Sequence, residues 1–271
     1  MMRNLSDGCS VVYDGSYAGF LSAVFESFRQ HLEVVDIVSD CAASGDFFRR
    51  SVAVATSAEQ AFRVSKAIRE RVGDDISKLL CRAFLSGEPG IELKLYAYIR
   101  AAFKPYLGFD PRNPLSPELA PLLKIAHSVA RELDLYYGMV RFQKLGGELY
   151  AARILPKYDI VTLLGSYFRR RLPDQKWLIY DDLRHYGIFY DLHSVVEVEI
   201  PCFKLPEDGD ERTLEWVEYY RASFIKERRN PRLLRQNLPV RYWDALPERR
   251  AEARVGLGKA GTSAGPALLK C

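Results

Sequence analysis

The chain has 271 residues, of which 48% are hydrophobic and 27% are charged, so it is long enough to bury a core and has the composition of a globular protein. The first residues lack the apolar run of a signal peptide, and no apolar stretch approaches the roughly 18 residues that a membrane helix needs. These features exclude disordered and membrane-spanning classes, and we expect a cytoplasmic protein that does not bind a membrane.

The cysteines and histidines show no spacing that is typical of a metal site. The five cysteines form no CxxC pair, and their odd number argues against a disulfide framework, so we expect free thiols in a reducing compartment. The four histidines form no HExxH or HxxxH pair. The sequence therefore predicts no metal centre and no cofactor.

Helical periodicity dominates the first half of the chain. We expect a short strand over 10–13, which leads through Asp14-Gly15-Ser16 into a helix, and a second strand over 51–55. Further helices are predicted over about 57–71, 75–86 and 90–106, and from Ser116-Pro117-Glu118 to about 137. Their apolar stripes are most simply explained as core packing.

Strand patterns appear in the second half. The runs 139–144 and 148–154 are joined through Gly146-Gly147, a hairpin signal, and a second antiparallel pair is expected over 177–181 and 187–191. A further strand is expected over 194–200, with helices over about 159–171, 211–229 and 231–237. We predict an α+β fold: an antiparallel sheet of hairpins packed against several helices, in a single domain over 1–248, with a disordered tail over 249–271.

Charge is distributed unevenly in the C-terminal half. The net charge of the whole chain is only +4, but residues 197–218 hold eight acids and two bases, whereas residues 221–241 hold seven bases and one acid. The two neighbouring blocks can neutralise each other, or the basic block can face a polyanion such as nucleic acid. Charge alone leaves both explanations open.

Three arginines fall on apolar faces of predicted helices. Arg171 ends the stripe of the helix over 159–171, and the helix over 211–229 carries Arg221 and Arg228 on the face of Leu214, Val217, Phe224 and Ile225. An unpaired buried charge is costly, so such arginines either pair with carboxylates or bind a ligand. Buried pairs with Asp181, Asp182 or Glu132 are the structural explanation.

The functional explanation is an open groove in which arginines bind phosphate and aromatic rings stack on bases. The candidate nucleic-acid-binding residues are Arg141, Arg171, Arg184, Arg221, Arg228, Arg232, Arg235, Arg241, Tyr180 and Trp243. No phosphate-binding loop, dinucleotide motif or hydrolase motif is present, so no catalytic residue is identified. Asp181 and Glu132 are the candidates for acid–base chemistry, although a turn acid paired with Arg184 is the favoured account of Asp181.

Short motifs in a fixed order also link the chain to a known family. These are Tyr13-Asp14-Gly15-Ser16, Arg131-Glu132, Gly138-Met139-Val140-Arg141-Phe142, Tyr167-Phe168, Trp177-Leu178-Ile179-Tyr180-Asp181, Glu227-Arg228-Arg229-Asn230-Pro231 and Arg241-Tyr242-Trp243. Over about residues 9–246 the chain resembles a bacterial family of uncharacterised proteins assigned to DNA metabolism or repair. Its members are typically encoded beside a radical-SAM protein of DNA modification or repair, and related domains are fused to uracil-DNA glycosylase-like domains.

The resemblance implies a role in DNA repair or modification, with DNA as ligand and a radical-SAM or uracil-DNA glycosylase-like protein as partner. The positions that match the family are Arg141, Arg171, Asp181, Arg184, Arg228 and Arg241. This chain has Asp134 and Tyr167 where similar proteins often carry histidine, so an activity that needs those histidines is lost or altered here.

Three hypotheses follow from the sequence. The first is a DNA-binding accessory protein that works with a partner enzyme. The second is an enzyme that acts on damaged or modified nucleotides through Asp, Glu or His side chains. The third is a protein-interaction module that does not bind nucleic acid and whose basic surface docks an acidic partner.

Overall fold

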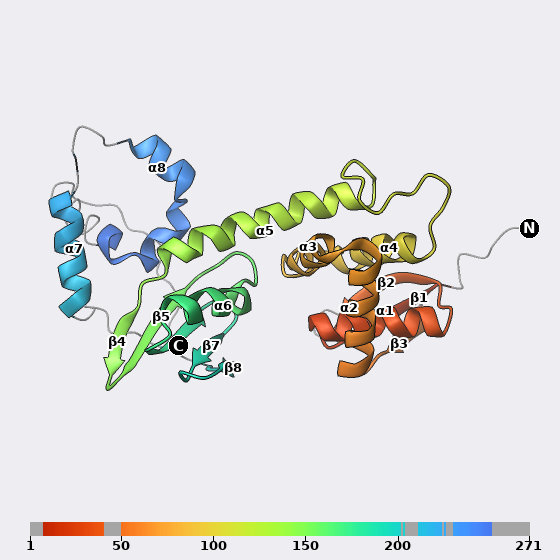
Figure 1. Ribbon diagram of the computed structural model, residues 1–271, viewed down its shortest axis with the longest axis horizontal. Coiled ribbons are helices and arrows are strands. Elements are labelled where there is room, and N and C mark those ends of the chain that lie inside the picture. The colour runs from red at the N-terminus through yellow and green to blue at the C-terminus, as the bar shows by residue number, and fades with distance from the viewer. Residues whose placement is uncertain are drawn as a thin grey trace, which may run out of the picture. The chain divides into compact units, whose positions relative to one another are not determined.

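The computed structural model describes residues 8–40, 50–201, 203, 211–223, 225 and 230–250, without the side chains of 211–213, 221, 244 and 245. Two compact units make up the chain (Figure 1): an N-terminal unit of Met1–Glu132 with Lys157–Asp159, and a C-terminal unit of Leu133–Pro156 with Ile160–Cys271. The two units are defined by how compactly their residues pack, which does not show whether they unfold together. One domain over 1–248 therefore stays a prediction. The predicted tail lies outside the described residues from 251 onward.

A small parallel sheet forms the N-terminal unit together with its helices. The strands β1 (Cys9–Tyr13), β2 (Val34–Ser39) and β3 (Arg50–Ala53) are arranged in the order β2-β1-β3, and β1 runs parallel to both neighbours. Parallel neighbours need a crossover connection, which α1 (Tyr17–Arg29) supplies between β1 and β2. The α+β class is confirmed, but the prediction of an antiparallel sheet is wrong here.

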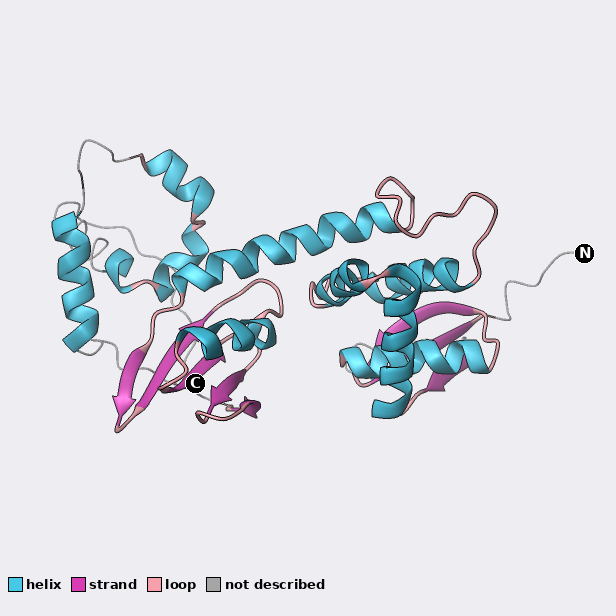
Figure 2. Ribbon diagram, in the orientation of Figure 1, coloured by secondary structure: helices cyan, strands magenta, loops and turns pink. Residues whose placement is uncertain are grey.

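The helices of this unit are α1, α2 (Ala58–Val72), α3 (Asp74–Phe84), α4 (Ile91–Phe103) and the first part of α5 (Leu119–Met139) (Figure 2). Of these, α1 packs on β1 and α4 packs on β2. Two N-caps fix the helix starts, because the Ser16 side chain accepts from Gly19 N at 2.9 Å and the Ser57 side chain accepts from Gln60 N at 3.4 Å. Most residues of the predicted apolar stripes lie in the core, where Phe20, Val24, Ile99 and Leu122 are buried, whereas Phe103 is exposed. Leu95 is buried in the same core.

The C-terminal unit holds a mixed five-stranded sheet in the order β4-β5-β6-β7-β8. Its strands are β4 (Gln143–Gly146), β5 (Leu149–Ile154), β6 (Lys176–Asp181), β7 (Tyr186–Tyr190) and β8 (Val195–Glu199). The predicted hairpins β4–β5 and β6–β7 are confirmed, whereas β5 and β6 pair in parallel, which corrects the all-antiparallel prediction. The helix α6 (Val161–Arg171) connects these two strands, as a parallel pair requires.

The helix α6 packs on the sheet through its buried residues Leu164 and Phe168. Phe168 meets the fully buried ring of Trp177, which stacks on Tyr190 with ring centroids 5.3 Å apart. A Cβ atom at Gly165 would lie 3.1 Å from Val195, so α6 also contacts the first residue of β8. The helix α6 therefore covers one face of the sheet at Val195, where β8 begins.

The remaining elements are α7 (Glu211–Ser223), α8 (Pro231–Asn237) and the 3₁₀ helix η3 (Val240–Ala245). The predicted apolar face of the helix over 211–229 is not core, because the Leu214 and Ile225 side chains are 63% and 48% exposed. Phe224 and Arg228 lie outside the described residues. In the described part of the chain, no helix combines the length and apolar character needed to cross a membrane.

Candidate functional site

A buried ion pair organises the turn between β6 and β7. Arg184 Nη1 lies 2.7 Å from Asp181 Oδ2, and Asp181 Oδ1 accepts from the backbone N–H of Leu183 at 2.8 Å. Burial raises the pKa of the Asp181 carboxyl above its ordinary value, although the hydrogen bond from Arg184 acts in the opposite direction. The pairing of a turn acid with Arg184 is confirmed, and the neighbouring Asp182 pairs with Arg153 at 3.7 Å.

Tyr180 and His185 brace the same turn. The Tyr180 hydroxyl donates to the carbonyl of Ile200 at 2.9 Å and lies 3.2 Å from His185 Nδ1. The ring of Tyr180 is buried against Phe203, so it offers no open face on which a base can stack. His185 has a φ of 58°, a left-handed conformation that is uncommon for residues other than glycine.

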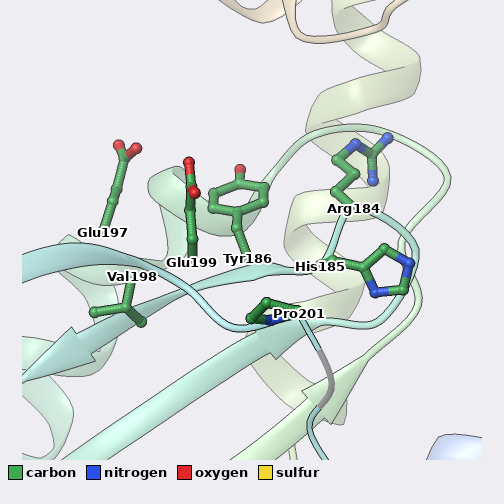
Figure 3. A pocket seen from close by; sticks show the side chains of 7 residues that line it. All are labelled: Arg184, His185, Tyr186, Glu197, Val198, Glu199 and Pro201. Carbon is green, nitrogen blue, oxygen red and sulfur yellow. The ribbon is translucent and has the colours of Figure 1, made fainter.

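An open hollow of about 860 Å³ lies between this turn and the end of β8. Its lining comes from two strand ends: Arg184, His185, Tyr186, Glu197, Val198, Glu199 and Pro201. Figure 3 shows the side chains of Tyr186, Glu197 and Glu199 on one side of the strands and that of Val198 on the other. Of the residues that the sequence singled out for nucleic acid, Arg184 lines this hollow.

Arg141 takes part in a separate network. Its Nη2 lies 3.1 Å from Glu248 Oε1, its Nη1 donates to the carbonyl of Gly138 at 2.6 Å, and its guanidinium lies over the Trp216 ring at 5.0 Å. Trp216 Nε1 donates to the other carboxylate oxygen of Glu248 at 3.1 Å. Arg141 therefore matches the structural explanation, a buried arginine–carboxylate pair.

Arginines and aromatic rings also contact one another near η3. The guanidinium of Arg249 lies 5.6 Å from the centroid of the Trp243 ring, and Trp243 Nε1 donates to the carbonyl of Leu238 at 3.0 Å. The guanidinium of Arg241 lies 4.6 Å from the centroid of the Tyr242 ring, which is buried. Of the two aromatic candidates, Trp243 thus lies against an arginine of the same chain, whereas Tyr180 packs on Phe203.

A different set of arginines is open to solvent. Arg169, Arg170 and Arg171 occupy the last turn of α6, and Arg232 and Arg235 lie on α8, all with exposed side chains. Within the described ranges, none of the five has a carboxylate within 4.0 Å. Sequence reasoning selected Arg171, Arg232 and Arg235 but not Arg169, although the run of three arginines is visible in the sequence.

Two predicted arginines are not placed. Arg221 belongs to α7, but its side chain is not described, and Arg228 lies outside the described residues. The arrangement of arginines on the apolar face of this helix therefore stays a prediction.

The two candidate acid–base carboxylates are both occupied. Glu132 is buried, and its two oxygens accept from the backbone N–H groups of Lys157 and Tyr158 at 2.9 and 2.8 Å. Asp181 is held in the same manner by its own turn. Neither carboxylate lines the hollow. Glu197 and Glu199 do line it, and sequence reasoning did not single them out.

Comparison with known proteins gives a family and no function. The family model described as "Domain of unknown function (DUF4130)" matches residues 89–248, which is more than half of the chain. No curated protein matches the chain. The expectation of an uncharacterised family is confirmed over this region. The chain belongs to the DUF4130 family.

Proposed function

We propose that this chain binds nucleic acid through exposed arginines of its C-terminal unit and acts in DNA repair or modification together with a partner enzyme. The carrying observation is the run Arg169-Arg170-Arg171, which is exposed at the end of α6 and has no carboxylate partner within the described residues. Guanidinium groups bind phosphate oxygens by paired hydrogen bonds. Three adjacent groups of this kind suit a polyphosphate backbone better than a single small anion.

The position of these arginines has a competing explanation. The negative end of a helix dipole favours cations in the last turn, whether or not a ligand binds. Arg82 provides a matched comparison, because it is an exposed arginine in the last turn of α3. A ligand-binding role requires the two helix ends to differ in their effect on nucleic acid.

In this proposal the chain binds DNA in the cytoplasm, and a partner enzyme catalyses the reaction. The resemblance to DNA-metabolism proteins favours a radical-SAM or uracil-DNA glycosylase-like protein in that role. The occupied carboxylates of Asp181 and Glu132 support it, because neither is available to exchange a proton with a ligand without breaking structural hydrogen bonds.

Fluorescence anisotropy with labelled single- and double-stranded DNA tests the proposal. Wild-type protein is expected to bind with a log–log salt slope of about −0.9 per phosphate neutralised on duplex DNA. Replacing Arg169, Arg170 and Arg171 by alanine is expected to weaken binding and flatten that slope, while Arg82→Ala leaves both unchanged. Absence of binding by the wild-type protein at low salt overturns the proposal.

One observation favours an enzyme as the second candidate. The lining of the hollow beside β8 includes His185, Tyr186 and Glu199, which carry an imidazole, a phenol hydroxyl and a carboxylate. Groups of these types transfer protons in enzymes that act on nucleotides. Product analysis on lesion-bearing oligonucleotides, with and without divalent metal, separates this candidate from an accessory role, since an accessory protein releases no product.

A further inference from the structure

The hollow beside β8 presents two carboxylates to one side of the sheet. Glu197 and Glu199 are alternate residues of a strand, so their side chains project in the same direction. The register of β7 and β8 sets Tyr186 directly opposite Glu199, and Figure 3 shows the tyrosine ring next to that carboxylate. An aromatic ring and two acidic groups therefore share one opening.

These carboxylates have no partner among the residues that the structure describes. Within the described residues, neither Glu197 nor Glu199 makes an ion pair or a side-chain hydrogen bond, and both side chains are exposed. Among the described residues of the lining, the one guanidinium is that of Arg184, which lies against the buried Asp181. Acidic charge thus exceeds basic charge among these residues, so they suit a group that donates hydrogen bonds and disfavour a phosphate.

The frame of the hollow is held by backbone hydrogen bonds. His185 N donates to the carbonyl of Asp181 at 2.9 Å, and Ile200 N donates to the carbonyl of His185 at 3.3 Å. These bonds fix His185 in its left-handed conformation at the rim and keep the start of β7 against the end of β8. A preformed opening of about 860 Å³ falls within the range of roughly 300–1,000 Å³ that is usual for small-molecule sites.

We propose that this hollow binds an unpaired guanine base, with a carboxylate of β8 accepting hydrogen bonds from the pairing edge of the base. Guanine presents its ring N–H and its amino group side by side, so both can donate to one carboxylate as a guanidinium does. Cytosine offers a carboxylate one amino group, and thymine offers one ring N–H. The Tyr186 ring supplies an aromatic surface beside the same edge.

The proposal rests on the proposed nucleic-acid function and gives that function a base preference. Val195, Glu197 and Glu199 share one face of β8, and α6 contacts that face at Val195. The helix that bears the arginine run thus covers the same face of the sheet as the carboxylates. The arginine run lies at the end of α6 that leads into Lys176, whereas the hollow lies at the other end of the strands, where Tyr186 pairs with Glu199. In the proposal, one DNA strand binds the arginines through its phosphates and extends along this face, so that one unstacked base enters the hollow.

Free nucleosides separate the two proposals, because they carry no phosphate for the arginines to bind. Chemical-shift titrations of ¹⁵N-labelled full-length protein with the four 2′-deoxynucleosides give relative affinities. Deoxyguanosine is expected to bind about tenfold more tightly than the other three, in line with the discrimination that a bidentate contact provides. Equal binding of all four, or no binding of deoxyguanosine, overturns the base site.

Charge-removing variants test the residues. Glu197→Gln and Glu199→Gln together are expected to abolish the guanine preference, and Glu215→Gln on α7, another exposed acid, is the matched control. A preference that survives the double variant overturns the assignment. The salt-dependent binding of DNA is expected to persist in the double variant, since α6 is unchanged. If the wild-type protein binds deoxyguanosine but does not bind DNA, the proposed function is overturned and the base site is not.

Discussion

Arg184 and Asp181 form an ion pair in which the carboxylate is fully buried and the guanidinium side chain is 25% exposed, with 2.7 Å between Nη1 and Oδ2. Arg184 Nη1 also donates to the carbonyl of Pro156 at 3.3 Å, so one side chain joins the turn after β6 to the segment before α6. The pair therefore holds two parts of the C-terminal unit together.

Breaking this pair is expected to destabilise the protein. Arg184→Ala leaves a buried carboxylate without its partner, which lowers the free energy of unfolding by roughly 3 kcal/mol. Urea denaturation followed by circular dichroism measures the change. Asp182→Ala is the control, because its pair with Arg153 is 3.7 Å long and partly exposed on both sides, and it is expected to cost less than about 1 kcal/mol. Equal effects of the two substitutions contradict this account.

The arginines are expected to divide into structural and ligand-binding groups. Arg141→Ala leaves Glu248 buried without its ion pair and lowers the free energy of unfolding by about 2 kcal/mol, since Arg141 itself is partly exposed. Arg171→Ala removes no ion pair with a described residue, so the melting temperature is expected to stay close to that of the wild type while DNA affinity falls. Thermal denaturation and anisotropy on the same samples give both quantities. A melting temperature that drops with Arg171→Ala as far as with Arg141→Ala contradicts the division.

Glu26 is expected to make stability depend on acid. The hydrogen bond from Gln30, together with those from Arg29 and Gln60, holds the pKa of Glu26 below its ordinary value, although burial acts in the opposite direction. A carboxyl with a lowered pKa in the folded state contributes stability that is complete above its unfolded pKa and is lost as the pH falls through the folded value. Denaturation midpoints of wild-type and Glu26→Gln protein should therefore differ at neutral pH and converge in acid. Glu33→Gln, at an exposed position, should show no such convergence.

Gly187 is expected to tolerate no side chain. A Cβ atom there would lie 2.5 Å from the carbonyl oxygen of Ile179 on the paired strand β6. Gly187→Ala must push the strands apart, at a cost of roughly 2 kcal/mol in the free energy of unfolding. Gly138, within α5, has no atom within 4 Å of the corresponding position, and Gly138→Ala is expected to be neutral or stabilising. Chemical denaturation of the pair checks both signs.

Local patterns in the sequence predicted most elements but not how the strands pair. The apolar run in Trp177–Asp181 and the glycines at 146 and 147 placed hairpins that the structure contains. The strand β2 was missed, because Asp36 interrupts its apolar run. Parallel pairing of β5 with β6 depends on a crossover helix and on contacts distant in the sequence, which periodicity does not encode.

Whether an arginine is paired or open to solvent also depends on residues that are distant in the sequence. The partner of Arg141 is Glu248, 107 residues away, so no pattern around Arg141 distinguishes a paired guanidinium from an open one. The alternation of Glu197 and Glu199 is visible in the sequence, whereas the lack of a partner for either among the described residues can be seen only in the folded chain. Sequence reasoning thus assigned Arg141 and Trp243 to a ligand, whereas Arg141 pairs with Glu248 and Trp243 lies against Arg249.

The region that matches the DUF4130 family begins inside the N-terminal compact unit. Similarity begins at residue 89, yet Leu95 and Ile99 of α4 are buried in the same core as Phe20 and Val24 of α1. A polypeptide truncated to the family region therefore exposes an apolar face of α4 to solvent and is prone to aggregate. Removal of the first 88 residues takes away α1 and is therefore expected to expose the face of α4 that carries Leu95 and Ile99.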